Sequence, residues 1–436
     1  MKLATVFSIG ATLMLGALYG APTSPVMLYS FPGQSAGAFP EASLVFNSSI
    51  GVLYGTTYAG GAAGLGTVFQ LSPPQQSGAP WNKKELYAFS GPDGANPEGG
   101  LIVGANFVLY GTTDLGGAAG YGAVFQLTPP VPPSTTWTET VLYSFTGGND
   151  GINPRASLTL NSITGVLYGT TYAGGPANYG TVFSLTPPVP PATAWTEQVL
   201  YSFSGGSDGA HPEAGLTLTS AGVLYGTSYS GGSAGWGTIF QLSPPTTGDT
   251  WTQRVLHSFT GGADGGSPAG GVILGQNSVL YGTASFGGDL SPNHCPINGV
   301  SSGCGVVFRL VPSGGPIATW TETVIHSFEG PPNDGSRPTQ NLVAATNGTL
   351  YGTTFTGEYA KALCFPASYI GCGMVYQLTP PAAPGGAWNE NILATFVDTN
   401  GGGPNGVVFG AGGALYGTTR VGGSAGGYGT IFQTIP

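Results

Sequence analysis

The chain has 436 residues, of which 78 are glycine, 36 are proline and only 6% are charged, against about 25% charged residues in an average globular protein. Its net charge is −10 with nine lysines and arginines, and the absence of clustered cations excludes a nucleic-acid-binding or polybasic membrane-binding protein. The 41% hydrophobic content, with 21 Tyr and 21 Phe, excludes an intrinsically disordered chain.

Residues 1–21 predict a secretory signal peptide. Lys2 supplies the short positive region, residues 3–18 are apolar, and small residues follow at Gly20-Ala21, as signal peptides require. The alternative is a buried or membrane-spanning helix. No other apolar stretch is long enough to cross a bilayer, so we expect a secreted or cell-surface protein with no membrane span after signal removal.

The first predicted strand covers residues 26–31, with the sequence Val-Met-Leu-Tyr-Ser-Phe. A close copy stands at 141–145 and again at 199–203, where it ends a longer unit. The N-terminal copy has no such unit before it. It is therefore a fourth strand that precedes the first unit.

A full unit, such as residues 157–203, predicts four strands: 157–160, 167–171, 181–185 and 195–203. Alternating apolar residues, β-branched and aromatic content, and glycine or proline between the segments are typical of strands. A glycine-rich loop (172–180 in this unit) joins the second and third strands. An Asp-Gly loop (204–213 here) leads to the next unit. The Leu-Tyr-Gly-Thr core of the second strand recurs, with at most one change, around Tyr54, Tyr110, Tyr168, Tyr225, Tyr281, Tyr351 and Tyr416.

The four predicted strands of the unit do not all occur equally often in the chain. The first three strands occur seven times, a fourth strand follows only the first six units, and the last unit stops at Phe432. An N-terminal strand that completes the last unit closes a ring and removes two free sheet edges, whereas an open solenoid would need polar caps. The sequence therefore predicts an all-β fold, with residues 22–436 forming one seven-bladed β-propeller of four-stranded blades.

The repeat also supports a family resemblance. The segment LYSFTGGNDGINPRASLTLNSITGVLYGTTYAGGPANYGTVFSLTPP, residues 142–188, resembles the tandem repeat of the GloVer family of exported bacterial proteins. The resemblance covers essentially all of the chain after the signal peptide. It implies export and a repeat architecture, but no activity or catalytic residues, because none is established for the family.

Aromatic residues recur in the glycine-rich loops. Four loops begin with Tyr58, Tyr172, Tyr229 or Phe355, and Trp236 stands near the end of one, where other units have Leu65, Tyr121, Tyr179 and Tyr428. In a propeller these loops share one face with the Asp-Gly loops. The aromatic residues could stack on sugar faces there, and we predict them as the binding residues. The alternative is that they cover glycine-rich backbone.

The Asp-Gly loops carry one carboxylate in five units, at Asp93, Asp150, Asp208, Asp264 and Asp334. Asp and Gly together are typical of tight turns. The alternative is a Ca²⁺ site, but calcium takes six to eight oxygen ligands, and one Asp per unit does not supply them. We therefore predict turns, and no bound metal.

All four cysteines lie in two expanded glycine-rich loops. In an exported protein we expect two local disulfides, Cys295–Cys304 and Cys364–Cys372. The alternative is a zinc site formed by the four thiolates, with His294, but the spacing differs from that of paired zinc ligands.

Catalytic motifs are absent from the sequence: it contains no nucleophile elbow, phosphate loop or HExxH. Glu98 and Glu213 each follow a proline in an Asp-Gly loop, as Glu41 does in the equivalent loop of the first unit, where Ala36-Gly37 replaces Asp-Gly, and the three could converge at the channel. The sequence thus predicts a secreted, non-enzymatic binding or surface-structural module for glycans or extracellular proteins, without a cofactor. The alternative function is a polysaccharide hydrolase or lyase at the channel mouth.

Overall fold

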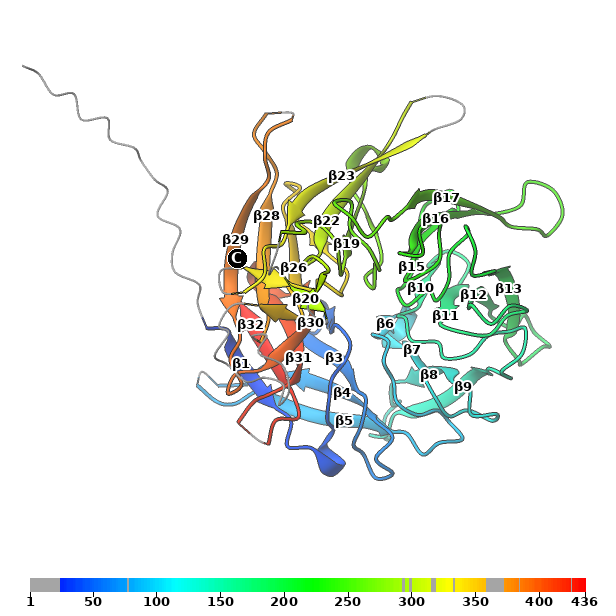
Figure 1. The fold of residues 1–436 in the computed structure, drawn as a ribbon. Coiled ribbons are helices and arrows are strands. Elements are labelled where there is room, and N and C mark those ends of the chain that lie inside the picture. The colour runs from blue at the N-terminus through cyan, green and yellow to red at the C-terminus, as the bar shows by residue number, and fades with distance from the viewer. Residues whose placement is uncertain are drawn as a thin grey trace, which may run out of the picture.

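The computed structural model describes residues 24–436 except 77, 292–294, 298–299, 315–318, 332–333, 358–371, 384 and 425. Seven four-stranded antiparallel sheets form the blades of a β-propeller (Figure 1). The predicted signal peptide, residues 1–21, lies outside the described residues. No helix in the described part of the chain is long and apolar enough to span a membrane.

Each blade runs from an inner strand beside the channel to an outer strand at the rim. Blade 1 consists of β2 (Val45–Asn47), β3 (Val52–Thr57), β4 (Thr67–Ser72) and β5 (Asn82–Ala88). Blade 2 consists of β6 (Ile102–Val103), β7 (Leu109–Thr113), β8 (Ala123–Thr128) and β9 (Thr138–Ser144). Blade 3 consists of β10 (Thr159–Leu160), β11 (Leu167–Thr171), β12 (Thr181–Thr186) and β13 (Thr196–Ser202). Blade 4 consists of β14 (Thr217–Leu218), β15 (Leu224–Ser228), β16 (Thr238–Ser243) and β17 (Thr252–Ser258). Blade 5 consists of β18 (Ile273–Leu274), β19 (Leu280–Ala284), β22 (Val306–Pro312) and β23 (Trp320–Ser327). Blade 6 consists of β25 (Val343–Ala344), β26 (Leu350–Thr354), β28 (Met374–Thr379) and β29 (Asn389–Thr395).

Blade 7 closes the ring, as the sequence predicts. It has the order β1-β32-β31-β30 and combines the two ends of the described chain: β30 (Gly402–Phe409), β31 (Leu415–Val421), β32 (Thr430–Thr434) and β1 (Val26–Ser30). The register pairs Val26 with Gln433 and Ser30 with Thr430. The inner ends are joined too, because the Asn405 amide donates to the carbonyl of Pro40 at 2.6 Å.

Blades pack through a repeated pair of aromatic rings. A phenylalanine that follows the outer strand of one blade meets the ring in the third strand of the next, as Phe145 meets Phe183 at 5.1 Å between centroids, and both side chains are fully buried. Six further junctions repeat this contact: Phe31–Phe69, Phe89–Phe125, Phe203–Phe240, Phe259–Phe308, Phe328–Tyr376 and Phe396–Phe432. The hydrophobic core is therefore a series of similar clusters between blades.

The Asp-Gly loops form hydrogen-bonded turns at the rim. Asp150 accepts hydrogen bonds from the backbone N–H of Thr146 at 2.7 Å, the Thr146 hydroxyl at 2.8 Å and the N–H of Gly148 at 3.2 Å. The hydroxyl of Tyr143, on the preceding strand, donates to the same carboxylate at 3.0 Å. Tyr201–Asp208 and Tyr87–Asp93 repeat that bond. These carboxylates thus stabilise turns, and each ties a loop to a strand.

Glutamates on the outer strands face several of these turns, and they make the stability depend on pH. Burial, and next the charge of Asp150, raise the pKa of Glu197 to about 7, and one of its carboxyl oxygens is buried without a hydrogen-bond partner. The folded-state pKa lies above the unfolded value. The protonated glutamate therefore contributes stability below about pH 4.5, and this contribution is lost as the pH rises towards about 7.

We expect Glu197→Gln to remove this dependence. Gln253 stands at the equivalent position of blade 4 and donates to the carbonyl of Asp208 at 3.2 Å, so the fold accepts an amide there. Urea unfolding should show the variant about 1 kcal/mol more stable than the parent at pH 8, after allowance for solvent screening, and little different at pH 4.5. An equal effect at both pH values would contradict the assignment.

Candidate functional site

A cavity of about 810 Å³ opens at the mouth of the central channel. Among the residues of its wall, every blade contributes the one that follows the proline of an Asp-Gly loop or of the loop equivalent to it. These seven residues, which we call the mouth ring, are Glu41, Glu98, Arg155, Glu213, Ala269, Thr339 and Asn405. The sequence pattern indicates the three glutamates as candidates, but the ring of seven residues is visible only in the structure.

The backbone before each proline sets the ring in place. In every blade this residue has a positive φ, between 50° and 62°, a conformation that is uncommon for residues other than glycine. In blade 3, Asn153 donates its N–H to the carbonyl of Tyr121 in blade 2, and accepts a hydrogen bond from the N–H of Tyr172, both at 3.0 Å. Strained residues held in this way cluster at functional sites.

One side of the mouth is charged. The Nε of Arg155 lies 2.9 Å from the carboxylate of Asp114 and 3.2 Å from that of Glu98. Across the point of closure, Arg420 pairs with Glu41 at 3.2 Å. With Glu213 and Arg337, the cavity wall holds three carboxyl groups, Glu41, Glu98 and Glu213, and three guanidinium groups, Arg155, Arg337 and Arg420.

Burial perturbs these carboxyl groups. It raises the pKa of Glu98 to about 7, against the lowering effect of Arg155, and the charges of Asp114 and Glu41 add to the rise. One oxygen of Glu98 is shielded from solvent without a hydrogen-bond partner. Burial also raises the pKa of Glu213, which Arg155 partly offsets. The mouth therefore holds a carboxyl group, that of Glu98, that can carry a proton near neutral pH.

Three of the five predicted aromatic binding residues, Tyr172, Tyr229 and Phe355, line the cavity. Tyr58 lies beside its acidic side, where burial, and then the charges of Asp114, Glu98 and Glu41, raise its pKa. Phe286 also lines the wall, and the sequence analysis missed it because it stands one residue later than the aromatic position of the other loops.

The ring of Tyr172 is already engaged by protein groups. The guanidinium carbon of Arg155 lies 4.4 Å from its centroid, and the imidazole of His211 stacks on it at 4.6 Å. Tyr229, Phe286 and Phe355 also line the cavity, and the guanidinium carbon of Arg337 lies 5.7 Å from the centroid of the Phe286 ring.

Trp236 has a different position from the other four. It is not among the residues that line the cavity, and its indole covers Gly261, where an added Cβ would lie 2.4 Å from the ring. Tyr121, Tyr179 and Tyr428 cover Gly147, Gly205 and Gly33 in the same way. This arrangement fits the alternative that the second set of aromatics shields glycine-rich backbone.

The disulfide Cys295–Cys304 is present, and its sulfur atoms lie against Gly330, where four other units place an aromatic ring on glycine. Cys372 is also disulfide-bonded, while its predicted partner Cys364 lies outside the described residues. Because disulfide sulfurs are poor zinc ligands, the alternative of a thiolate zinc site is wrong for Cys295 and Cys304.

Solved structures share the fold of this chain. An ancestral GH74 enzyme is 13% identical, with a TM-score of 0.53 over 96% of this chain and 51% of that chain. A protein of Bacteroides uniformis described as a candidate 6-phosphogluconolactonase is 13% identical, with a TM-score of 0.49 over 87% of this chain and 89% of that chain. At such low identity the likeness to the GH74 enzyme shows the fold alone. A comparison with curated proteins finds no match.

A family profile accounts for nearly the whole chain. The Gloeobacter/Verrucomicrobia repeat matches residues 5–183, 82–293 and 295–436, and so covers all seven blades. This is the family that the repeated segment resembles, and the chain belongs to the Gloeobacter/Verrucomicrobia repeat proteins.

Proposed function

We propose that this protein is an exported, non-enzymatic module that binds glycans in the mouth of its channel. The observation that carries the proposal is the cavity of about 810 Å³, in which aromatic rings and paired charged groups meet. Its volume lies in the range of small-ligand pockets, about 300–1,000 Å³. The disulfide Cys295–Cys304 is compatible with an oxidising, extracellular setting.

The chemistry of the wall suits sugars. A pyranose has an apolar face that packs on aromatic rings, for which Tyr229, Phe286 and Phe355 are placed. Its hydroxyl groups both donate and accept, and they can pair with the carboxylate of Glu213 and the guanidinium of Arg337. The mouth combines aromatic rings and charged groups within one cavity. A purely apolar ligand would not require the charged groups, and a purely ionic ligand would not require the aromatic rings.

Glycan-array screening followed by calorimetry tests this function. We expect Phe355→Ala and Tyr229→Ala each to weaken binding by about tenfold or more, because a buried aromatic contact contributes more than about 1 kcal/mol. Phe107→Ala is the matched control, since Phe107 is 41% exposed in the turn between β6 and β7, on the opposite face. Absence of binding to any glycan on the array would contradict the proposal.

Glu98 supports a second candidate, polysaccharide hydrolysis or lysis. A mostly buried carboxyl group with a pKa of about 7, whose Oε2 lies 3.2 Å from Nε of Arg155, can act as a proton donor to a leaving group at neutral pH. Release of reducing sugar that is abolished by Glu98→Gln, with binding retained, would favour this function. If no bound glycan released reducing sugar, this second function would be rejected and the binding function would stand.

A further inference from the structure

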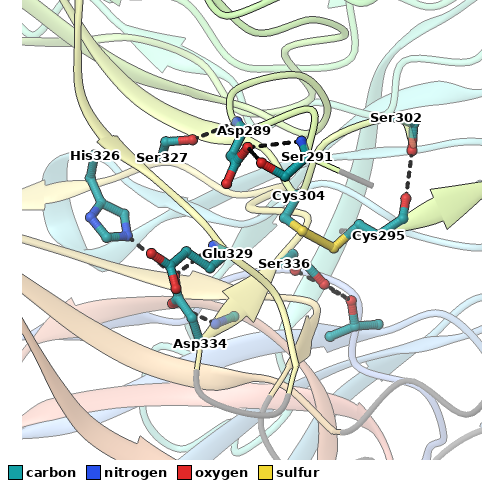
Figure 2. The surroundings of a disulfide bond; sticks show 12 residues. Asp289, Ser291, Cys295, Ser302, Cys304, His326, Ser327, Glu329, Asp334 and Ser336 are labelled. Atoms are coloured by element: carbon teal, nitrogen blue, oxygen red, sulfur yellow. Dashed lines mark hydrogen bonds and ion pairs between the residues drawn. A yellow bond between two sulfur atoms is a disulfide. The ribbon is translucent and has the colours of Figure 1, made fainter. Parts of the chain in front are cut away.

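A second polar cluster lies away from the mouth, between the outer parts of blades 5 and 6. His326 comes from β23, Asp334 from the loop that follows it, and Glu390 from β29 of the next blade. One nitrogen and two carboxylate oxygens of these residues lie within 4.8 Å of one another. Figure 2 shows the imidazole of His326 turned towards Asp334, beside the Cys295–Cys304 disulfide.

The three donor atoms are close but not hydrogen-bonded to one another. Nε2 of His326 lies 3.6 Å from Oδ2 of Asp334 and 3.4 Å from Oε1 of Glu390, which is longer than a hydrogen bond of this kind. Both Nε2 of His326 and Oε1 of Glu390 are shielded from solvent without a hydrogen-bond partner among the described residues. The two atoms face each other only as an ion pair at 3.4 Å, and a buried ion pair without good hydrogen bonds recovers its desolvation cost poorly, so a metal ion bound between them would be stabilising.

The two separations from Nε2 of His326, 3.6 and 3.4 Å, match the edges of a small coordination sphere, and the two carboxylate oxygens lie within 4.8 Å of each other. Zn²⁺ binds nitrogen and carboxylate oxygen at about 2.0–2.2 Å in a tetrahedron, and the ligand atoms of such a tetrahedron lie roughly 3.3–3.6 Å apart. We propose that His326, Asp334 and Glu390 bind a divalent transition metal, with Zn²⁺ the best fit and water as the fourth ligand. Ca²⁺ fits poorly, because it needs six to eight oxygen ligands.

The junction between blades 4 and 5 provides an internal comparison. It has the same residue types, His257, Asp264 and Glu322, but there Nε2 of His257 is hydrogen-bonded to Asp264 at 3.2 Å. In the described part of the chain, only the His326 group gathers three such donor atoms. The site therefore depends on the geometry of this junction as well as on its residue types.

The protein holds one of the ligands in place before any metal binds. Asp334 is only 6% exposed, and its two oxygens accept the N–H groups of Glu329 at 2.8 Å and Gly335 at 2.6 Å. Gly330, next to Glu329, lies against the disulfide, because a Cβ added there would lie 2.7 Å from both sulfurs. A positioned carboxylate of this kind lowers the entropic cost of binding the ion.

Metal binding by the disulfide-oxidised chain tests the proposal. After treatment with EDTA and dialysis, calorimetric titration with ZnCl₂ should show about one ion per chain, and the ion should raise the melting temperature. His326→Tyr should weaken binding by roughly 100-fold or more, since it removes a direct ligand. This variant should fold, because tyrosine occupies the position in blades 1 to 3 and donates to the loop carboxylate there.

His257→Tyr is the control, and it should bind Zn²⁺ as the parent does. The proposal is overturned if the parent binds no Zn²⁺, if His326→Tyr binds it equally well, or if the ion that raises the melting temperature is Ca²⁺ and not Zn²⁺. Because all described cysteines are in disulfides, binding to thiolates does not confuse the result.

Discussion

Removal of the chain up to Phe31 should prevent the propeller from folding cooperatively. The truncation deletes β1, exposes the edge of β32, and uncovers the core cluster that joins blades 7 and 1. Phe31 is fully buried and meets Phe69 at 5.4 Å, and its N–H donates to Gly429 at 2.9 Å. We expect the truncated chain to show no sharp thermal transition, or one lowered by more than about 10 °C.

A single substitution measures the same contact with less disruption. Phe31→Ala should lower the free energy of unfolding by about 3–5 kcal/mol, the cost of removing a fully buried phenylalanine. Val26→Ala is the control within the same strand, because Val26 is 61% exposed, and its effect should stay within about 0.5 kcal/mol. Equal effects of the two substitutions in urea unfolding would show that the N-terminal strand does not close the ring.

The second large effect concerns the glycine at the end of each glycine-rich loop. Gly180 has φ +93°, and an added Cβ would lie 2.4 Å from the carbonyl oxygen of Thr171 and 2.8 Å from Cδ of Pro212 in the next blade. In Gly180→Ala, the added methyl group would therefore push the segment that carries Glu213 into the mouth away from the glycine-rich loop. We expect a loss of about 4 kcal/mol in urea unfolding, from backbone strain and steric overlap together.

Gly248→Ala separates the two contributions. Gly248 also has a positive φ, +70°, but nothing lies within 4 Å of an added Cβ. This variant should lose only about 1–2 kcal/mol, the cost of a left-handed backbone for alanine. If both variants lost the same free energy, the close packing of Gly180 against blade 4 would have no energetic role.

The mouth and the metal site would have different tasks. The mouth ring lies where all seven blades meet, and it presents groups that a ligand can use. The His326 group lies at one junction near the rim, where the ring departs from its repeat: β20 (Pro296–Ile297) and β21 (Val300–Ser301) form an added two-stranded sheet in the described part of the expanded loop. A metal ion there would join blades 5 and 6 without affecting the mouth directly.

The amino-acid sequence by itself determined the architecture. The seven copies of three strands, the six copies of a fourth and the spare strand at residues 26–31 predicted both the number of blades and the way they close. This worked because each blade is a local series of hairpins, whose alternation and turn residues lie within one repeat. The Cys295–Cys304 pairing was predictable for the same reason, since both residues lie in one loop.

Only the tertiary structure decided which side chains meet. Arg155 pairs with Asp114 of the preceding blade, Trp236 turns to Gly261 and not to the cavity, and His326 meets Glu390 of the next blade. These partners are far apart in the sequence, and their contacts depend on how adjacent blades are inclined around the axis, which no pattern within one repeat records. The pKa of Glu98 follows the same rule, because it depends on burial and charge that several blades create together.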